Sequence, residues 1–311
     1  MKRTWALVAA VLAAAAPLAR GTQITLPVYL EDNHAGSFYW LAQHLDLEEP
    51  CTLLHFDAHS DASAIFDSDV IRARLRRVDS TAERARILAD WRKQGAVQCF
   101  NWIEPLLPAP IADVIWIPRE HLDPEAAKKL ADNAADLLDS QLEAAPRAAG
   151  KFRPRLHVTG RDALDAAIPT GRAIVATIDL DYFADIPPNE CAEAFERVWS
   201  SVTELRDLRA ITIAISRPFL HSDEQADQLV QMALRAALSL PTATIQFEPF
   251  QMVANDQSTR AKELRKQGLD VPSFDLVKAS PALRALLLRA GDRIAVLDES
   301  ARYQQLLHDW R

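Results

Sequence analysis

The stretch "LLHFDAHSDAS", residues 53–63, joins an apolar run to three ionisable side chains at alternate positions. An apolar run of this kind is typical of a strand that is covered on both faces of a sheet. Asp57, His59 and Asp61 follow at a spacing of two, and alternate residues of an extended segment point in the same direction. The stretch therefore predicts a buried strand whose carboxyl end holds something positively charged.

The rest of the chain alternates apolar runs with amphipathic segments. The runs predict strands at 23–30, 51–56, 112–117, 173–178, 210–215, 243–247 and 293–297. Helices are expected between Ser80 and Gly95 and at 124–143, 223–239 and 281–290, where cap residues mark their starts. This order predicts an α/β fold in three αβα layers, with a doubly wound, mostly parallel sheet. Residues 22–311 are expected to form one domain, with 144–172 as an irregular excursion.

The N-terminus has the pattern of a secretory signal peptide. Lys2 and Arg3 precede the apolar run "WALVAAVLAAAA" and the small-residue exit "PLARGT". Residues 1–21 are therefore expected to be removed near Ala19–Gly21, which predicts a periplasmic or secreted protein. An uncleaved anchor is the alternative reading, although the run is short for a membrane span. The chain has three cysteines, Cys51, Cys99 and Cys191, so at most one disulfide is expected within it.

The net charge of −8 argues against a nucleic-acid surface, which needs a basic face, and it fits a site for cations. The scattered glycines form neither a dinucleotide-binding fingerprint nor a Walker loop, and the sequence has no CxxC or HExxH motif.

Two further predicted strands end in possible metal ligands. The strand "AIVATI", 173–178, runs into Asp179 and Asp181, and the first strand runs into His34. Ligands of open parallel sheets bind outside the carboxyl ends of the strands. Packed carboxylates raise one another's pKa, and divalent cations relieve that cost. Six ligands fit two ions, and oxygens with two imidazoles suit Mn²⁺, with Zn²⁺ and Fe²⁺ ranked below it. The plain alternative is a set of caps and turn acids, with a core histidine at position 59.

Four segments together carry a resemblance to a known superfamily. "DAHSD" and, about 120 residues later, "DLD" resemble the two signature blocks of the arginase, agmatinase and deacetylase superfamily in its two-manganese ureohydrolase form. The finer likeness is carried by "EDNHAGSFYW", "HFDAHSD", "FNWIEPLL" and "IDLDYF" together. The nearest likeness is to a poorly characterised arginase-fold group that includes peptide arginases, which convert arginine side chains of peptides to ornithine. The resemblance implies one manganese held by His34, Asp57, Asp61 and Asp179 and another held by Asp57, His59, Asp179 and Asp181.

In that assignment Asp57 and Asp179 bridge the two ions. The family's first histidine lies in a "GGDH" block that is absent here, so His34 takes that role, with His44 and His55 as lesser substitutes. His55 precedes the strand exit and is expected to face the core or to support the ligands.

The resemblance also implies a reaction. A metal-activated water would hydrolyse a C–N bond of a linear amidine, here the guanidino group of arginine, and release urea. Asp181 is the expected proton shuttle, and Asp57 and His59 complete the catalytic set. A deacetylase-like amidohydrolase and a non-catalytic metal- or peptide-binding protein remain as alternatives.

A cationic substrate also calls for a carboxylate away from the metals. The candidates are Glu104, Glu120, Asp223, Glu224 and Glu248. Asn101 and Trp102 are expected to shape the pocket or to pack a helix end. Arg217 and His221, after another strand, are expected at the rim of the site.

Overall fold

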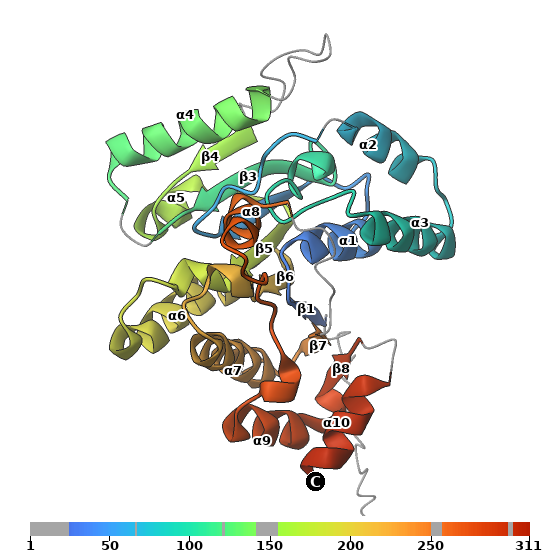
Figure 1. Ribbon diagram of the computed structural model, residues 1–311. Coiled ribbons are helices and arrows are strands. Elements are labelled where there is room, and N and C mark those ends of the chain that lie inside the picture. Colours follow the sequence, from blue (N-terminus) through green and yellow to red (C-terminus); the bar gives the residue numbers. More distant parts are fainter. Residues whose placement is uncertain (1–24, 66, 120–121, 141–154, 250–256, 298–300) are drawn as a thin grey trace, which may run out of the picture.

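The computed structural model describes residues 25–65, 67–119, 122–140, 155–249, 257–297 and 301–311. Its strands form one sheet in the order β4-β3-β2-β5-β6-β1-β7-β8, and every pairing is parallel (Figure 1). The strands are β1 (Leu26–Glu31), β2 (Cys51–Phe56), β3 (Ile111–Ile117), β4 (Leu156–Val158), β5 (Ile174–Asp179), β6 (Leu208–Ala214), β7 (Ala243–Glu248) and β8 (Ile294–Val296). The predicted α/β fold with a doubly wound parallel sheet is confirmed.

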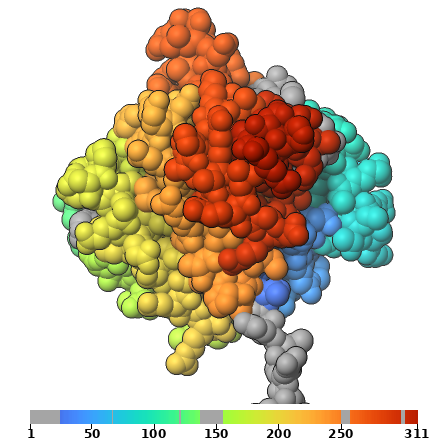
Figure 2. Space-filling model, turned by 90° about the horizontal axis from the view of Figure 1, so that it is seen from below, coloured from blue at the N-terminus to red at the C-terminus, as the bar shows by residue number. Residues whose placement is uncertain are grey.

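Helices cover both faces of the sheet and complete three layers. One core contains side chains of α1 (Ala35–His44), α2 (Ser68–Arg76), α3 (Thr81–Gln94) and α4 (Pro124–Ser140). The core on the other face contains side chains of α5 (Leu164–Ala167), α6 (Pro188–Thr203), α7 (Asp223–Ser239), α9 (Pro281–Ala290) and α10 (Arg302–Trp310). Figure 2 shows the C-terminal residues from α9 onward gathered on one side of the molecule.

The central strands are buried on both faces, as their continuous apolar sequences predict. All six residues of β2 are buried, and so are all six of β5. Within β2, Leu54 and Phe56 enter one core while Cys51 and Leu53 enter the other, because successive side chains of a strand point to opposite faces. A strand of this kind leaves only its ends available to solvent and ligands.

The predicted helix starts lie where the cap residues indicated. The hydroxyls of Ser80, Ser222 and Ser280 accept hydrogen bonds from backbone N–H groups at the starts of α3, α7 and α9. Gly95 ends α3 with a φ of 63°, a left-handed conformation that favours glycine. Helix α8 (Thr259–Lys266) was not predicted, and the predicted extension of α4 to residue 143 lies outside the described residues.

The expectation of an irregular excursion at 144–172 is wrong for the part that the structure describes. Residues 155–172 contain α5 and also β4, which pairs with β3 at the edge of the sheet. The predicted signal peptide lies outside the described residues. All three cysteines are buried free thiols, so the one allowed disulfide is not formed. No helix in the described ranges is long and apolar enough to cross a membrane.

The chain changes direction at β2 and β5, which are neighbours in the sheet. From β2 it passes through α2 and α3 to β3, whereas from β5 it passes through α6 to β6 on the other side. The connecting helices lie on opposite faces. Such a switch point opens a crevice at the carboxyl ends of the two strands, where ligands bind in this class of fold.

Candidate metal centre

The crevice brings together the histidines and aspartates that follow three strands. Asp57, His59 and Asp61 follow β2. Asp179 is the last residue of β5, and Asp181 lies in the turn η5 (Leu180–Phe183) that follows it. His34 comes from the loop between β1 and α1. In the described part of the chain, the groups that could hold a metal ion are His34/Asp57/Asp61/Asp179, Asp57/His59/Asp181 and His34/His55/Asp57. We call the first two the inner and the outer group.

The inner group is centred on His34. Its Nδ1 lies 3.0 Å from Asp57 Oδ2, 2.9 Å from Asp61 Oδ2 and 3.1 Å from Asp179 Oδ2. All four side chains are buried. One imidazole nitrogen cannot give a proton to three carboxylates at once, and three carboxylates this close repel one another. A divalent cation among the four atoms removes both problems.

The outer group shares Asp57 with the inner group and extends from it to solvent. His59 Nδ1 lies 2.9 Å from Asp181 Oδ2 and 3.5 Å from Asp57 Oδ1. The side chain of His59 is 50% exposed, whereas those of Asp57 and Asp181 are buried. Asp57 belongs to both groups, which is the arrangement that the resemblance implies for a bridging ligand. Asp179 belongs only to the inner group, and its Oδ1 accepts a hydrogen bond from the backbone N–H of Asp181 at 3.0 Å.

Buried polar atoms in the cluster are left without hydrogen bonds. His34 Nδ1, Asp57 Oδ2 and Asp181 Oδ2 have no hydrogen-bond partner among the residues that the structure describes. Buried polar groups of native proteins are almost always satisfied, so these three atoms in one cluster call for a bound group. The donor set of carboxylate oxygens and imidazole nitrogens therefore fits a metal ion.

The protonation of the cluster reflects this crowding. Burial raises the pKa of Asp57 well above its usual range, and the charges of Asp61, Asp181 and Asp179 raise it further. Burial and the charge of Asp179 raise the pKa of Asp181 to about 6. Without a metal, the site therefore holds protons between its carboxylates.

The pKa values of the two proposed histidine ligands, His34 and His59, are also raised. Burial lowers the pKa of His59, but the neighbouring carboxylates of Asp181 and Asp57 outweigh it and raise the pKa to about 12. Burial likewise opposes the charged form of His34, yet the three inner carboxylates raise its pKa well above the usual value. Without a metal, both imidazoles therefore favour the protonated form, whose positive charge offsets the negative charge of the neighbouring carboxylates.

Several side chains hold the ligands in position. The Trp102 indole donates a hydrogen bond to Asp61 Oδ2 at 2.9 Å, and the Trp116 indole donates to the backbone oxygen of Asp57 at 2.8 Å. His34 Nε2 lies 2.7 Å from the hydroxyl of Thr177, which leaves Nδ1 for the carboxylates. Such contacts set the tautomer and the orientation of a metal-binding histidine. Trp102 thus belongs to the site, whereas Asn101 accepts a local hydrogen bond from the backbone of Gln98.

His55 lies beside the ligands, and His44 does not belong to any of the groups that could hold a metal. The ring centroid of His55 is 5.4 Å from that of His34, and its Nε2 is 3.4 Å from Asp57 Oδ2. Burial lowers the pKa of His55 well below its usual value. This fits the expectation that His55 supports the ligands.

The segment after β6 contributes two residues that the sequence did not single out. Ser216, in a left-handed conformation with a φ of 48°, donates its hydroxyl hydrogen to Asp179 Oδ2 at 2.6 Å. Phe219, in the turn η6 (Arg217–Phe219), places its ring 4.8 Å from that of His59.

Arg217 pairs with Asp223 at 2.7 Å, and His221 pairs with Asp185 at 3.0 Å, so each of these rim candidates has an acidic partner.

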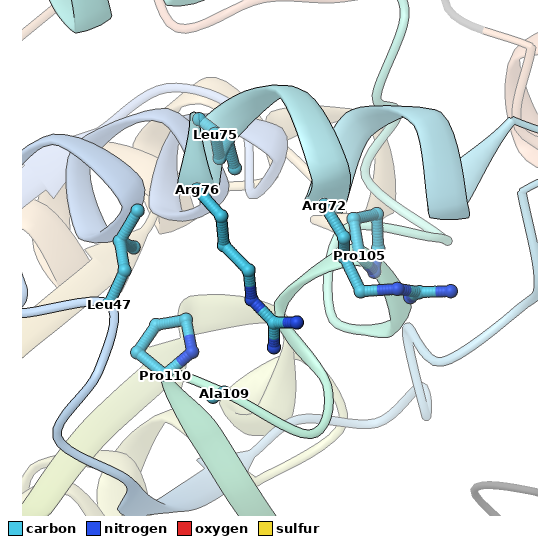
Figure 3. A pocket seen from close by; sticks show the side chains of 7 residues that line it. All are labelled: Leu47, Arg72, Leu75, Arg76, Pro105, Ala109 and Pro110. Atoms are coloured by element: carbon cyan, nitrogen blue, oxygen red, sulfur yellow. The ribbon is translucent and has the colours of Figure 1, made fainter. Parts of the chain in front are cut away.

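Three of the proposed cation-binding acids are already paired, and the first of them is Glu104. Glu104, buried in the turn η1 (Glu104–Leu106), accepts hydrogen bonds from Ser68 at 3.0 Å and from Arg72 at 3.0 Å. Arg72 also lines a small pocket beneath α2, with Leu47, Leu75, Arg76, Pro105, Ala109 and Pro110 (Figure 3). This pocket shares no residue with the metal groups. Glu104 is therefore part of a structural ion pair.

Glu248 likewise binds an internal cation. Both of its oxygens lie 2.9 Å from the guanidinium of Arg92, and Tyr29 donates a further hydrogen bond to it. Glu224 is exposed in the first turn of α7, Asp223 is the partner of Arg217, and Glu120 lies outside the described residues. The described candidates for a substrate carboxylate are thus paired or exposed.

Comparison with protein-family models and with curated protein sequences finds no match to this chain. Its candidate function therefore rests on the fold, on the switch point at β2 and β5, and on the geometry of the His/Asp cluster.

Proposed function

We propose that this protein is a binuclear manganese hydrolase that acts on the guanidino group of arginine side chains, preferably in peptides, and releases urea. The observation that carries the proposal is the position of Asp57. Its Oδ2 faces His34 at 3.0 Å and its Oδ1 faces His59 at 3.5 Å, so it belongs to both metal groups. A carboxylate with one oxygen toward each of two ligand sets suits a pair of ions. Oxygen ligands with two imidazoles favour Mn²⁺.

The buried acids supply the proton transfer. When bound, the two ions would lower the pKa of a water that they share, so that hydroxide is available near neutral pH. Asp181 is buried, and its carboxylate lies 2.9 Å from His59 Nδ1 on the side of the cluster that reaches solvent, where it can take up a proton and pass it on. We assign to Asp181 the delivery of a proton to the amine that leaves when the guanidino C–N bond breaks.

The solvent-facing side of the cluster is where we place the substrate. His59 is the half-exposed ligand, and the ring of Phe219 lies beside it. A planar guanidinium can lie against an aromatic face, which supports a cationic substrate at this mouth. We also propose that the protein is exported, because the pattern of its first 21 residues is that of a signal peptide. An exported enzyme would encounter peptides outside the cytoplasm, which favours peptidyl arginine as its substrate.

The decisive experiment compares substrates and two aspartate variants. Protein loaded with Mn²⁺ is assayed for urea from free arginine, agmatine and an arginine-containing peptide. Asp181→Asn should lower kcat by about 10²–10⁴-fold while most of the metal is retained, because an amide offers an oxygen ligand but cannot carry the proton. Asp57→Asn should lose metal and activity together. Asp90→Asn, on the exposed face of α3, is the matched control and should change neither.

The result that would overturn the proposal is also defined. If the manganese-loaded protein releases acetate from acetylated amines and never urea from any guanidine, the site is that of an amidohydrolase. If neither product forms although two ions are bound, the protein is a metal-binding protein without this activity.

A further inference from the structure

We propose that His55 is a positioning residue that holds the outer metal group together. The inference rests on the proposed binuclear site and goes beyond it, because it assigns a role to a residue that is not among the proposed ligands. His55 is fully buried in β2, two residues before Asp57. Its Nε2 lies 3.2 Å from the backbone oxygen of His59 and 3.4 Å from Asp57 Oδ2.

The surroundings of the ring select one tautomer. Nδ1 of His55 is buried and has no hydrogen-bond partner in the part of the chain that the structure describes. A proton on Nδ1 would be buried without an acceptor, and it would leave the lone pair of Nε2 facing two oxygens. A proton on Nε2 instead points at the His59 carbonyl and at Asp57. His55 therefore acts as an N–H donor and not as a metal ligand.

Together with Asp57, this donor fixes the backbone of His59. The N–H of His59 donates to Asp57 Oδ1 at 2.6 Å, and its carbonyl oxygen faces His55 Nε2 at 3.2 Å. Both backbone groups of this residue are thus tied to the end of β2. The imidazole of His59 is 50% exposed and has the ring of Phe219 on one side, so these backbone contacts help to fix its position.

The inner group has independent supports. Trp102 holds Asp61 at 2.9 Å, the hydroxyl of Thr177 lies 2.7 Å from His34, and Ser216 holds Asp179 at 2.6 Å. Loss of the His55 donor should therefore release the ion of the outer group and leave the ion of the inner group in place.

The experiment counts ions in the wild type, in three variants of His55 and in one control variant. The wild type should bind about two Mn²⁺ per chain with the electron paramagnetic resonance spectrum of a coupled pair. His55→Phe keeps an aromatic ring without the donor and should bind about one, with the spectrum of isolated Mn²⁺. His55→Gln places an amide N–H near the position of Nε2 and should restore the second ion, whereas His55→Asn should not. His44→Phe, at the exposed end of α1, is the control and should keep two.

Each contrary outcome has a distinct meaning. Two coupled ions in folded His55→Phe, or loss of both ions from it, would overturn the inference. If His55→Phe does not fold, the Gln and Asn variants decide, and equal metal contents in the two would overturn it. A wild type that binds fewer than two ions would instead overturn the binuclear site itself, so the two failures are distinguishable.

Discussion

The indole nitrogen of Trp102 donates a hydrogen bond to Asp61 Oδ2 at 2.9 Å, so a fully buried tryptophan holds a carboxylate of the inner metal group. The same ring packs 4.9 Å from that of His34. Because one side chain touches two ligands of one ion, its contribution should appear in metal affinity rather than in the proton transfer.

Trp102→Phe should therefore weaken Mn²⁺ binding about 10–100-fold, since it keeps an aromatic ring but removes the donor to Asp61. Trp199→Phe is the matched control, because Trp199 is a buried tryptophan of α6 that packs on Phe195. Titration of metal-free protein with Mn²⁺ measures both. Equal losses in the two variants would mean that the effect comes from core packing.

The hydroxyl of Thr177 should matter in a similar way through His34. Thr177→Val keeps the shape of the side chain and leaves His34 Nε2 without its partner at 2.7 Å, so Mn²⁺ affinity should fall about 10-fold or more. Thr52→Val is the control, because the buried Thr52 hydroxyl has no hydrogen-bond partner among the described residues. That control should bind Mn²⁺ normally and unfold at the same or a higher temperature.

The ligands could be predicted from the sequence because strand exits leave a local signature. The expectation of extended backbone after β2 is wrong, because residues 58–59 form a bend and Asp61 has a φ of 48°, so turns bring these side chains together. The spacing of two after a continuous apolar run still marks the exit of a buried strand at Asp57, His59 and Asp61. The second pair, Asp179 and Asp181, repeats it after β5. The parallel order of strands then brings the exits to one edge of the sheet.

The residues that the sequence did not reveal depend on contacts between distant segments. Ser216 reaches Asp179 only because β6 lies beside β5 and the turn after it is left-handed. Glu248 looked free as a sequence position, yet Arg92 of α3, 156 residues away, binds it. The edge strand β4 is three residues long, and only its first residue is buried, so its sequence contains no clear apolar run.

Removal of the metal should destabilise the protein. Ions that bind only the folded state stabilise it by about 2.7 kcal/mol at a concentration 100 times the dissociation constant, so a chelator should lower the melting temperature by several degrees. Asp179→Asn removes a charge from the inner group and should abolish most of that difference. Identical melting curves of the wild type with and without chelator would contradict the metal site.

The pH dependence should have opposite signs with and without metal. Burial and then Asp179 raise the pKa of Asp181 to about 6 from an ordinary value of 3.8, so between these values the metal-free folded state binds more protons than the unfolded state. This group therefore makes the metal-free protein less stable as the pH rises through that window. His59 stays protonated in the folded state there, and the loss of its proton in the unfolded state near pH 6 acts in the same direction.

Mn²⁺ binding, in contrast, should strengthen as the pH rises through about 6, because coordination needs the carboxylate of Asp181 without its proton. The proton of His59, whose pKa of about 12 reflects its acidic neighbours against the opposing effect of burial, must also leave when an ion binds. Calorimetric titration in buffers of different ionisation enthalpy should therefore show net proton release on binding at neutral pH. Asp181→Asn should reduce that release near pH 6 and flatten the rise in affinity. Proton uptake on binding, or an affinity that falls between about pH 5 and 7, would contradict coordination by these residues.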